Sequence, residues 1–138
     1  MYAITKKIQI VNKADIPKDS FINNEISPSA KLKFICYKCS HENLLKITPY
    51  ESGFPVFQLY HENKILSIND LLKNSMIKET QKNMLHVGEF TFNDLPTLYF
   101  GTDCESCAAK YIVIFSYGEK QPGLEILSVS GIWEYAEA

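Results

Sequence analysis

The sequence predicts a mainly β fold, a β-rich α+β domain in which an antiparallel sheet carries two hairpins and one inserted helix. Polar and apolar residues alternate over residues 31–36, which is typical of a half-buried strand. Residues 111–117 are apolar on both faces and therefore indicate a central strand. One helix start is indicated by Ser67 and Asp70, which stand three residues apart before two leucines.

The first half of the chain alternates strands with polar connections. Strands are predicted, in order, at residues 4–10, 31–36, 44–48, 55–60 and 64–68. Residues 12–30 hold Pro17, Pro28 and several Asn, Asp and Ser residues, so we expect a long loop with at most one short element. The last two strands flank His61-Glu62-Asn63, which predicts a hairpin.

The second half begins with the helix and returns to strands. One helix of two to four turns is predicted within residues 68–84. Further strands are predicted at residues 90–92, 96–100, 111–117 and 124–129. Residues 118–123 contain two glycines and a proline, so they are predicted to form the turn of a hairpin. Gly131 interrupts the last apolar run and predicts a β-bulge.

The length of 138 residues suits one domain, and we expect residues 1–138 to form it. No apolar run approaches the ~18 residues of a membrane span. The first ten residues place lysines within an alternating pattern and do not resemble a secretory signal. The sequence therefore predicts a cytoplasmic protein without a membrane segment.

All fourteen basic residues are lysine, against sixteen acidic residues, for a formal charge of −2. Residues 1–50 carry eight lysines and four acids, whereas residues 51–138 carry six lysines and twelve acids. Arginine is the usual reader of guanine and the usual bidentate clamp on phosphate. Its absence argues against sequence-specific nucleic-acid recognition and phosphoryl transfer, and the charge distribution favours a protein partner.

The four cysteines form two Cys-x-x-Cys pairs, Cys36 with Cys39 and Cys104 with Cys107. Each pair lies between two predicted strands, so each is expected at the tip of a hairpin. Two thiolates on one tight turn can converge on a cation, and a second such turn completes the tetrahedral sulfur shell that zinc prefers. The spacing therefore predicts one structural Zn²⁺ with these four ligands.

These paired turns resemble the knuckles of zinc-ribbon proteins, in which two Cys-x-x-Cys hairpins clasp one structural zinc. The resemblance covers residues 31–48 and 96–130, with an inserted hairpin and helix near residues 55–85. It implies a closed metal site that stabilises the fold and does not activate water. Ser40 and Ala108 stand where many such knuckles carry glycine, next to a left-handed backbone position.

Other chemistries use the same residues. A thiol-redox enzyme needs its Cys-x-x-Cys at the start of a helix, but a strand follows Cys107. Structural disulfides are disfavoured in a cytoplasmic protein. Iron accepts four cysteine ligands as zinc does, and His41 is an alternative ligand in place of one cysteine.

No catalytic residues are predicted. His41-Glu42-Asn43 and His61-Glu62-Asn63 repeat a tripeptide, but neither has the second histidine of a metalloprotease helix, so both are interpreted as turns. His86 is interpreted as a strand residue between apolar neighbours. Aromatic residues are expected mainly in the core, with some as anchors for a protein partner; they include Tyr50, Phe54, Phe57, Tyr60, Trp133 and Tyr135.

The predicted function is a non-catalytic protein-binding module stabilised by zinc. In general character such a small, acidic chain resembles bacterial immunity proteins, which bind and block a cognate toxin. One alternative is a nucleic-acid-associated zinc-ribbon protein, because Lys31, Lys33, Lys38 and Lys46 surround the first cysteine pair. The second alternative is a Cys-x-x-Cys thiol-redox protein.

Overall fold

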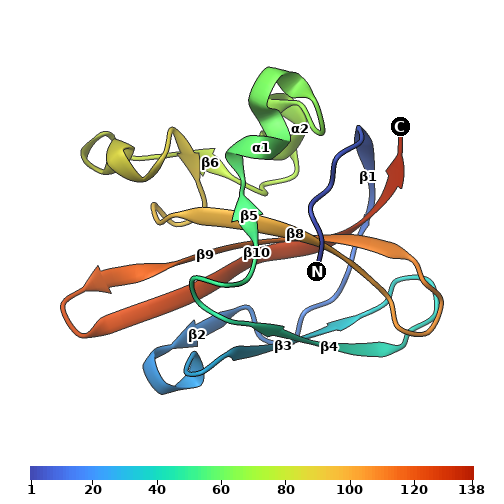
Figure 1. The fold of residues 1–138 in the computed structure, drawn as a ribbon, viewed down its shortest axis with the longest axis horizontal. Helices are drawn as coiled ribbons and strands as arrows, with labels where there is room; N and C mark the ends of the chain where they lie inside the picture. Colours follow the sequence, from blue (N-terminus) through green and yellow to red (C-terminus); the bar gives the residue numbers. More distant parts are fainter.

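The computed structural model describes residues 1–138, with 46% of them in strands and 16% in helices, which confirms the mainly β class. A six-stranded antiparallel sheet crosses the middle of the molecule (Figure 1). Its strands are β1 (Ile8–Lys13), β2 (Ser20–Ile22), β5 (Phe54–Pro55), β8 (Thr97–Asp103), β9 (Lys110–Gln121) and β10 (Leu124–Glu137). The order is β1-β10-β9-β8-β5. β2 also pairs with β10, at residues 126–128, whereas β1 pairs with residues 133–137 of the same strand.

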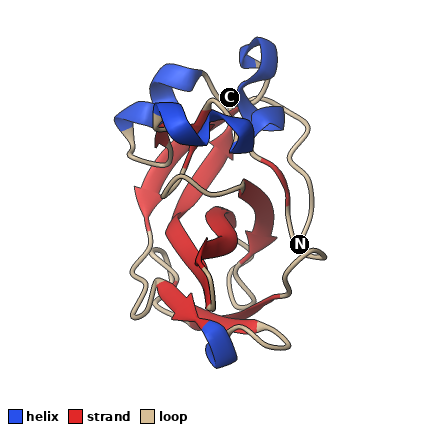
Figure 2. Ribbon diagram, turned by 90° about the vertical axis from the view of Figure 1, so that its left-hand side faces the viewer, coloured by secondary structure: helices blue, strands red, loops and turns tan.

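Two thinner layers cover the faces of this sheet. On one face lie β3 (Ala30–Ile35) and β4 (Glu42–Ile47), which form a separate antiparallel pair. Most of the helical turns gather on the opposite face, as Figure 2 shows. This second layer contains α1 (Phe57–Tyr60), η2 (His61–Asn63), α2 (Ile68–Lys73), β6 (Lys78–Glu79), η3 (Lys82–Val87) and β7 (Phe90–Thr91); η1 (Asn23–Glu25) follows β2. No helix combines the length and apolar character needed to cross a membrane.

Strand β9 lies at the centre and supplies both cores, as its apolar sequence predicted. Tyr111, Val113 and Phe115 belong to the cluster shared with β3 and β4. Ile112 and Ile114 belong to the cluster beneath the helical layer. Successive side chains of a strand point to opposite faces, so this one segment holds both covering layers against the sheet.

The predicted hairpin at residues 55–68 is wrong. β5 is only two residues long and pairs with β8, and the chain then turns into α1 and η2. Within residues 55–63, the buried residues are Val56 and Leu59, and they are three apart, which is a helical spacing. Burial on one side of a helical turn therefore overrides the strand-like composition.

The predicted helix within residues 68–84 begins where expected but is shorter than two turns. The Ser67 hydroxyl accepts a hydrogen bond from the N–H of Asp70 at 3.1 Å, which confirms the N-cap. The helix α2 ends at Lys73, because Ser75 adopts a left-handed backbone with φ of 57°. The rest of the segment is irregular apart from β6 and η3.

Three further predictions concern the start of the first strand, the turn between β9 and β10, and the bulge at Gly131. The first strand begins at Ile8 rather than at residue 4. The predicted hairpin of residues 111–117 with 124–129 is confirmed, but its turn is shorter than the predicted 118–123, because β9 continues to Gln121 and only Pro122 and Gly123 remain between the strands. Gly118 lies within β9, where a Cβ would approach the Leu95 side chain to 3.0 Å. The bulge at Gly131 is confirmed by the register shift between Val129 and Gly131.

Candidate metal centre

Both Cys-x-x-Cys pairs lie in tight turns that join two antiparallel strands. In the first turn, between β3 and β4, the N–H of Ser40 donates to the carbonyl of Cys36 at 3.0 Å. In the second turn, between β8 and β9, the N–H of Ala108 donates to the carbonyl of Cys104, also at 3.0 Å. The two hairpin tips are therefore built alike, and each presents its pair of sulfurs on one side.

Ser40 and Ala108 adopt left-handed backbones, with φ of 62° and 61°. These are the two positions at which the knuckle resemblance implies glycine. The knuckle geometry is thus kept without glycine, at a conformational cost of about 1 kcal/mol for each residue with a Cβ.

Ser40→Gly and Ala108→Gly are each expected to raise the free energy of unfolding by about 0.5–1 kcal/mol, because they relieve this strain. The measurement is denaturant unfolding of the zinc-loaded protein. Ser106→Gly is the matched control, since Ser106 is exposed in the same turn as Ala108 without a left-handed backbone. Equal destabilisation by all three substitutions would contradict the prediction.

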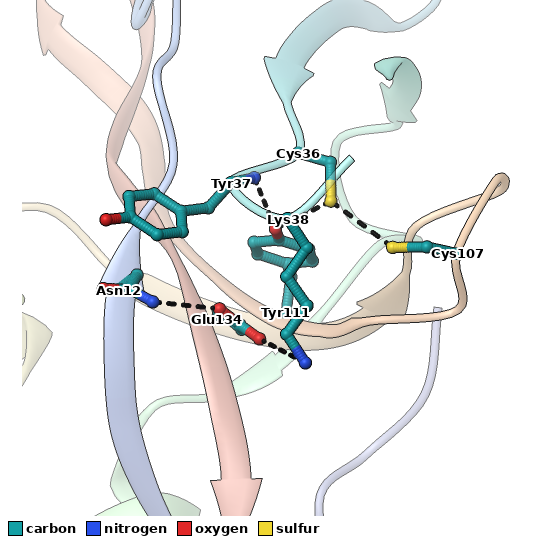
Figure 3. Close-up of polar contacts among 7 residues, drawn as sticks. All are labelled: Asn12, Cys36, Tyr37, Lys38, Cys107, Tyr111 and Glu134. Atoms are coloured by element: carbon teal, nitrogen blue, oxygen red, sulfur yellow. Dashed lines mark hydrogen bonds and ion pairs between the residues drawn. The ribbon is translucent and has the colours of Figure 1, made fainter. Parts of the chain in front are cut away.

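The four sulfurs converge, although 64 residues lie between Cys39 and Cys104. The Sγ atoms of Cys36 and Cys107 are 3.6 Å apart (Figure 3), and so are those of Cys39 and Cys104. All four ligand atoms lie within 4.8 Å of one another. Zn–S bonds of 2.3 Å in a tetrahedron place sulfurs about 3.8 Å apart, so the cluster has the dimensions of a four-thiolate zinc site.

The protein pushes the pKa values of these thiols in opposite directions. Burial opposes ionisation of Cys36, but hydrogen bonds from Tyr111 and from two N–H groups of the turn outweigh it and lower the pKa to about 6. The pKa of Cys104 is lowered in the same way, by the turn and by Asn43, against the effect of burial. For Cys107 the Ala109 N–H favours the thiolate, yet burial and the neighbouring sulfurs raise the pKa to about 12.

Hydrogen bonds explain this asymmetry. Those made to Cys36 and Cys104 favour their thiolates, whereas the hydrogen bonds of Cys107 with the neighbouring sulfurs favour its protonated thiol. A divalent cation at the centre would take the place of these sulfur–sulfur hydrogen bonds and deprotonate the coordinating thiols. The cluster is therefore suited to a cation with a preference for four sulfur ligands, which is the chemistry of structural zinc.

Each hairpin also supplies one polar side chain to the other hairpin's turn. From β9, the Tyr111 hydroxyl donates to Sγ of Cys36 at 3.1 Å and accepts from the N–H of Tyr37 at 2.9 Å (Figure 3). From β4, the Asn43 amide donates to Sγ of Cys104 at 3.5 Å and accepts from the N–H of Glu105 at 2.9 Å. Both side chains are buried, so these contacts fix the turns relative to each other.

A buried carboxylate joins the first turn to the main sheet. The side chain of Glu134, on β10, is 5% exposed, and one of its oxygens lies 3.2 Å from the Lys38 ammonium. Lys38 stands between Cys36 and Cys39 in the sequence. Its other oxygen accepts from the Asn12 amide on β1 at 3.2 Å (Figure 3). Lys38 thereby holds the turn against β10.

The histidines lie outside the sulfur cluster. His41, considered as an alternative ligand, is exposed, with its Nε2 3.8 Å from a carboxylate oxygen of Glu105. His61 lies in η2, a turn as predicted. The strand assignment of His86 is wrong, because it is exposed on η3.

Asn43, Tyr111 and Glu134 were not predicted as site residues. Asn43 was interpreted only as part of a turn tripeptide, and Tyr111 only as the start of a core strand. One signal was present: each follows the second cysteine of its pair by four residues, Asn43 after Cys39 and Tyr111 after Cys107. Glu134 carries no such signal, because its pairing depends on the register of β10.

Comparisons with models of protein families, with curated proteins and with solved structures find no match. The cysteine geometry is compatible with a zinc-ribbon-like motif, and the case for a metal site rests on that geometry.

Proposed function

We propose that this chain is a non-catalytic binding module, held together by one structural zinc ion, that binds and occludes a cognate partner protein. One observation carries the proposal: all four sulfurs of the cluster come from the chain and lie within 4.8 Å of one another. They fill the coordination shell that zinc prefers and leave no open position for water or substrate. The ion would then stabilise the fold, and the partner would bind to the protein surface.

We infer the kind of partner from the small size of the chain and from its acidic second half. A small acidic chain with a structural metal resembles bacterial immunity proteins, which block a cognate toxin. The twelve acidic and six basic residues of residues 51–138 suit a basic cleft on the partner. We expect the chain to act in the cytoplasm, where thiols remain reduced and able to bind zinc.

Co-expression with the product of a neighbouring gene tests the proposal. We expect a tight complex on gel filtration, weakened by salt, and restored growth if the neighbour is toxic. No complex would contradict the proposal. Reduction of disulfide substrates by the metal-free protein would favour the redox alternative instead. Binding of mixed-sequence oligonucleotides that falls steeply with salt would favour the nucleic-acid alternative, to which the exposed Lys31, Lys33 and Lys46 of β3 and β4 lend support.

A further inference from the structure

Two adjacent hollows open where the loop of residues 48–53, between β4 and β5, passes β9. Their volumes are about 400 and 360 Å³, and both are lined by Pro49 and Tyr117. In Figure 1 this loop runs from the β3–β4 layer across to β5, beside the β9–β10 hairpin. We call the combined depression the tyrosine groove and define it by Pro49, Tyr50 and Tyr117 with the two hollows on either side.

The floor of the second hollow is apolar. It is lined by Pro96, Leu98 and Phe115, of which Phe115 is 1% exposed and Leu98 is half-buried. Gly53 allows the loop to come this close, because a Cβ there would lie 3.0 Å from the Phe115 ring. The second hollow therefore offers an apolar lining to an aliphatic side chain of a partner.

Tyr50 lies at the rim of the groove, and nearly all of its side chain is exposed to solvent. Its exposed fraction is 93%, and its backbone is left-handed, with φ of 66°. Its ring packs edge-on against Tyr117, with centroids 5.4 Å apart. The loop is closed by hydrogen bonds from the N–H groups of Glu51 and Ser52 to the carbonyl of Thr48. The backbone of the loop is thus held in place, and the contact with Tyr117 restricts the Tyr50 ring before a partner covers it.

Carboxylates surround the groove. Glu51 lines one hollow and Glu125 the other. Glu119 lies directly opposite Glu125 on the neighbouring strand β9. None of the three forms an ion pair within the chain. Like charges opposite each other destabilise a sheet, so these acids favour a cation from outside.

We propose that the tyrosine groove binds an extended segment of the partner protein that presents an aliphatic side chain next to a lysine or arginine. The aliphatic group packs on Leu98 and Phe115, and the cation lies near the carboxylates and the Tyr50 ring. This inference rests on the proposed function, because it names the surface and the partner chemistry through which occlusion occurs. Phosphate groups are repelled here, so a nucleic acid is disfavoured at this surface.

The β3–β4 pair offers a matched control surface of opposite charge. Lys31 and Lys46 face each other across the two strands, are exposed, and form no ion pair within the chain. Replacing them changes the same number of surface charges as replacing Glu51 and Glu125, at another site.

The test uses the zinc-loaded full chain, labelled with ¹⁵N, and a blocked octapeptide, Gly-Ser-Leu-Arg-Leu-Arg-Ser-Gly. We expect saturable amide shifts at Gly53, Tyr117 and Gly118, with a dissociation constant of about 0.1–1 mM. Tyr50→Ala and the double variant Glu51→Gln/Glu125→Gln should each weaken binding about fivefold or more. Lys31→Gln/Lys46→Gln should leave it unchanged, and the peptide with Glu in place of Arg should not bind.

Each other outcome overturns the inference. One is that the peptide causes no saturable amide shift, and another is that the shifts centre on β3 and β4. A third is that the lysine control variant weakens peptide binding as much as the other variants do. The fourth is that the chain instead forms a concentration-dependent dimer that Tyr50→Ala dissociates. Failure of the proposed function is distinguishable, because it is measured by the complex with the neighbouring gene product. If that complex forms and Tyr50→Ala leaves its affinity unchanged, the function stands and the groove is excluded.

Discussion

Removal of the metal is expected to lower the free energy of unfolding by at least about 5 kcal/mol and the melting temperature by about 10–20 °C. Structural zinc contributes about 10–16 kcal/mol in small zinc modules. Here the effect is smaller, because the apolar cluster beneath the helical layer contains none of the four cysteines. The other cluster contains Cys36 and Cys104, so we expect loss of the metal to loosen the packing of β3 and β4 against the sheet.

Elemental analysis of the purified protein should find one zinc per chain, and calorimetry with and without a chelator measures the stability change. Cys104→Ser should reproduce the effect of the chelator. His41→Ala is the matched control, because His41 is exposed near the cluster and is not part of it. A metal-free protein that is well folded and indifferent to chelators would contradict both the metal site and the proposed role of the metal.

Tyr111→Phe and Asn43→Leu are expected to weaken zinc affinity about 10–100-fold each, because both residues hydrogen-bond to a coordinating sulfur of the opposite hairpin. Each should also lower the free energy of unfolding by about 1–3 kcal/mol, since a partly buried main-chain N–H loses its acceptor. Zinc affinity is measured by competition with a chromophoric chelator, separately from denaturant unfolding.

Tyr99→Phe is the matched control for Tyr111→Phe. The Tyr99 hydroxyl is likewise buried and accepts from a main-chain N–H, that of Ile4, at 3.2 Å, but it does not contact the cysteines. We expect Tyr99→Phe to lower stability and leave zinc affinity unchanged. Equal zinc affinities in the two variants would reduce Tyr111 to a packing residue.

The parts of the fold that could be predicted are those in which local pattern and burial agree. β3 alternates because one of its faces is covered, and β9 is apolar throughout because both of its faces are covered. The segment after Phe54 could not be predicted, because Val56, Phe57, Leu59 and Tyr60 fit a strand by composition while only a tertiary contact selects the helical turn.

The cysteines could be identified from spacing, since two thiolates on each of two turns match the ligand pattern of a tetrahedral zinc site. The two pairs come together only through the tertiary structure, which local sequence patterns do not predict. The supporting contacts of Asn43 and Tyr111 required the structure for the same reason. The pairing of Lys38 with Glu134 required the register of β10.

The distance between the two hairpins along the chain has a consequence for biosynthesis. Cys104 follows Cys39 by 65 positions in the chain. At about 5–20 residues per second, the ribosome needs about 3–13 s to make the second pair after the first. During that interval Cys36 and Cys39 form an incomplete, oxidisable half-site on the nascent chain. Zinc delivered during that interval can meet only two of the four sulfurs, so we expect the yield of correctly assembled protein to rise when the waiting thiols are kept reduced.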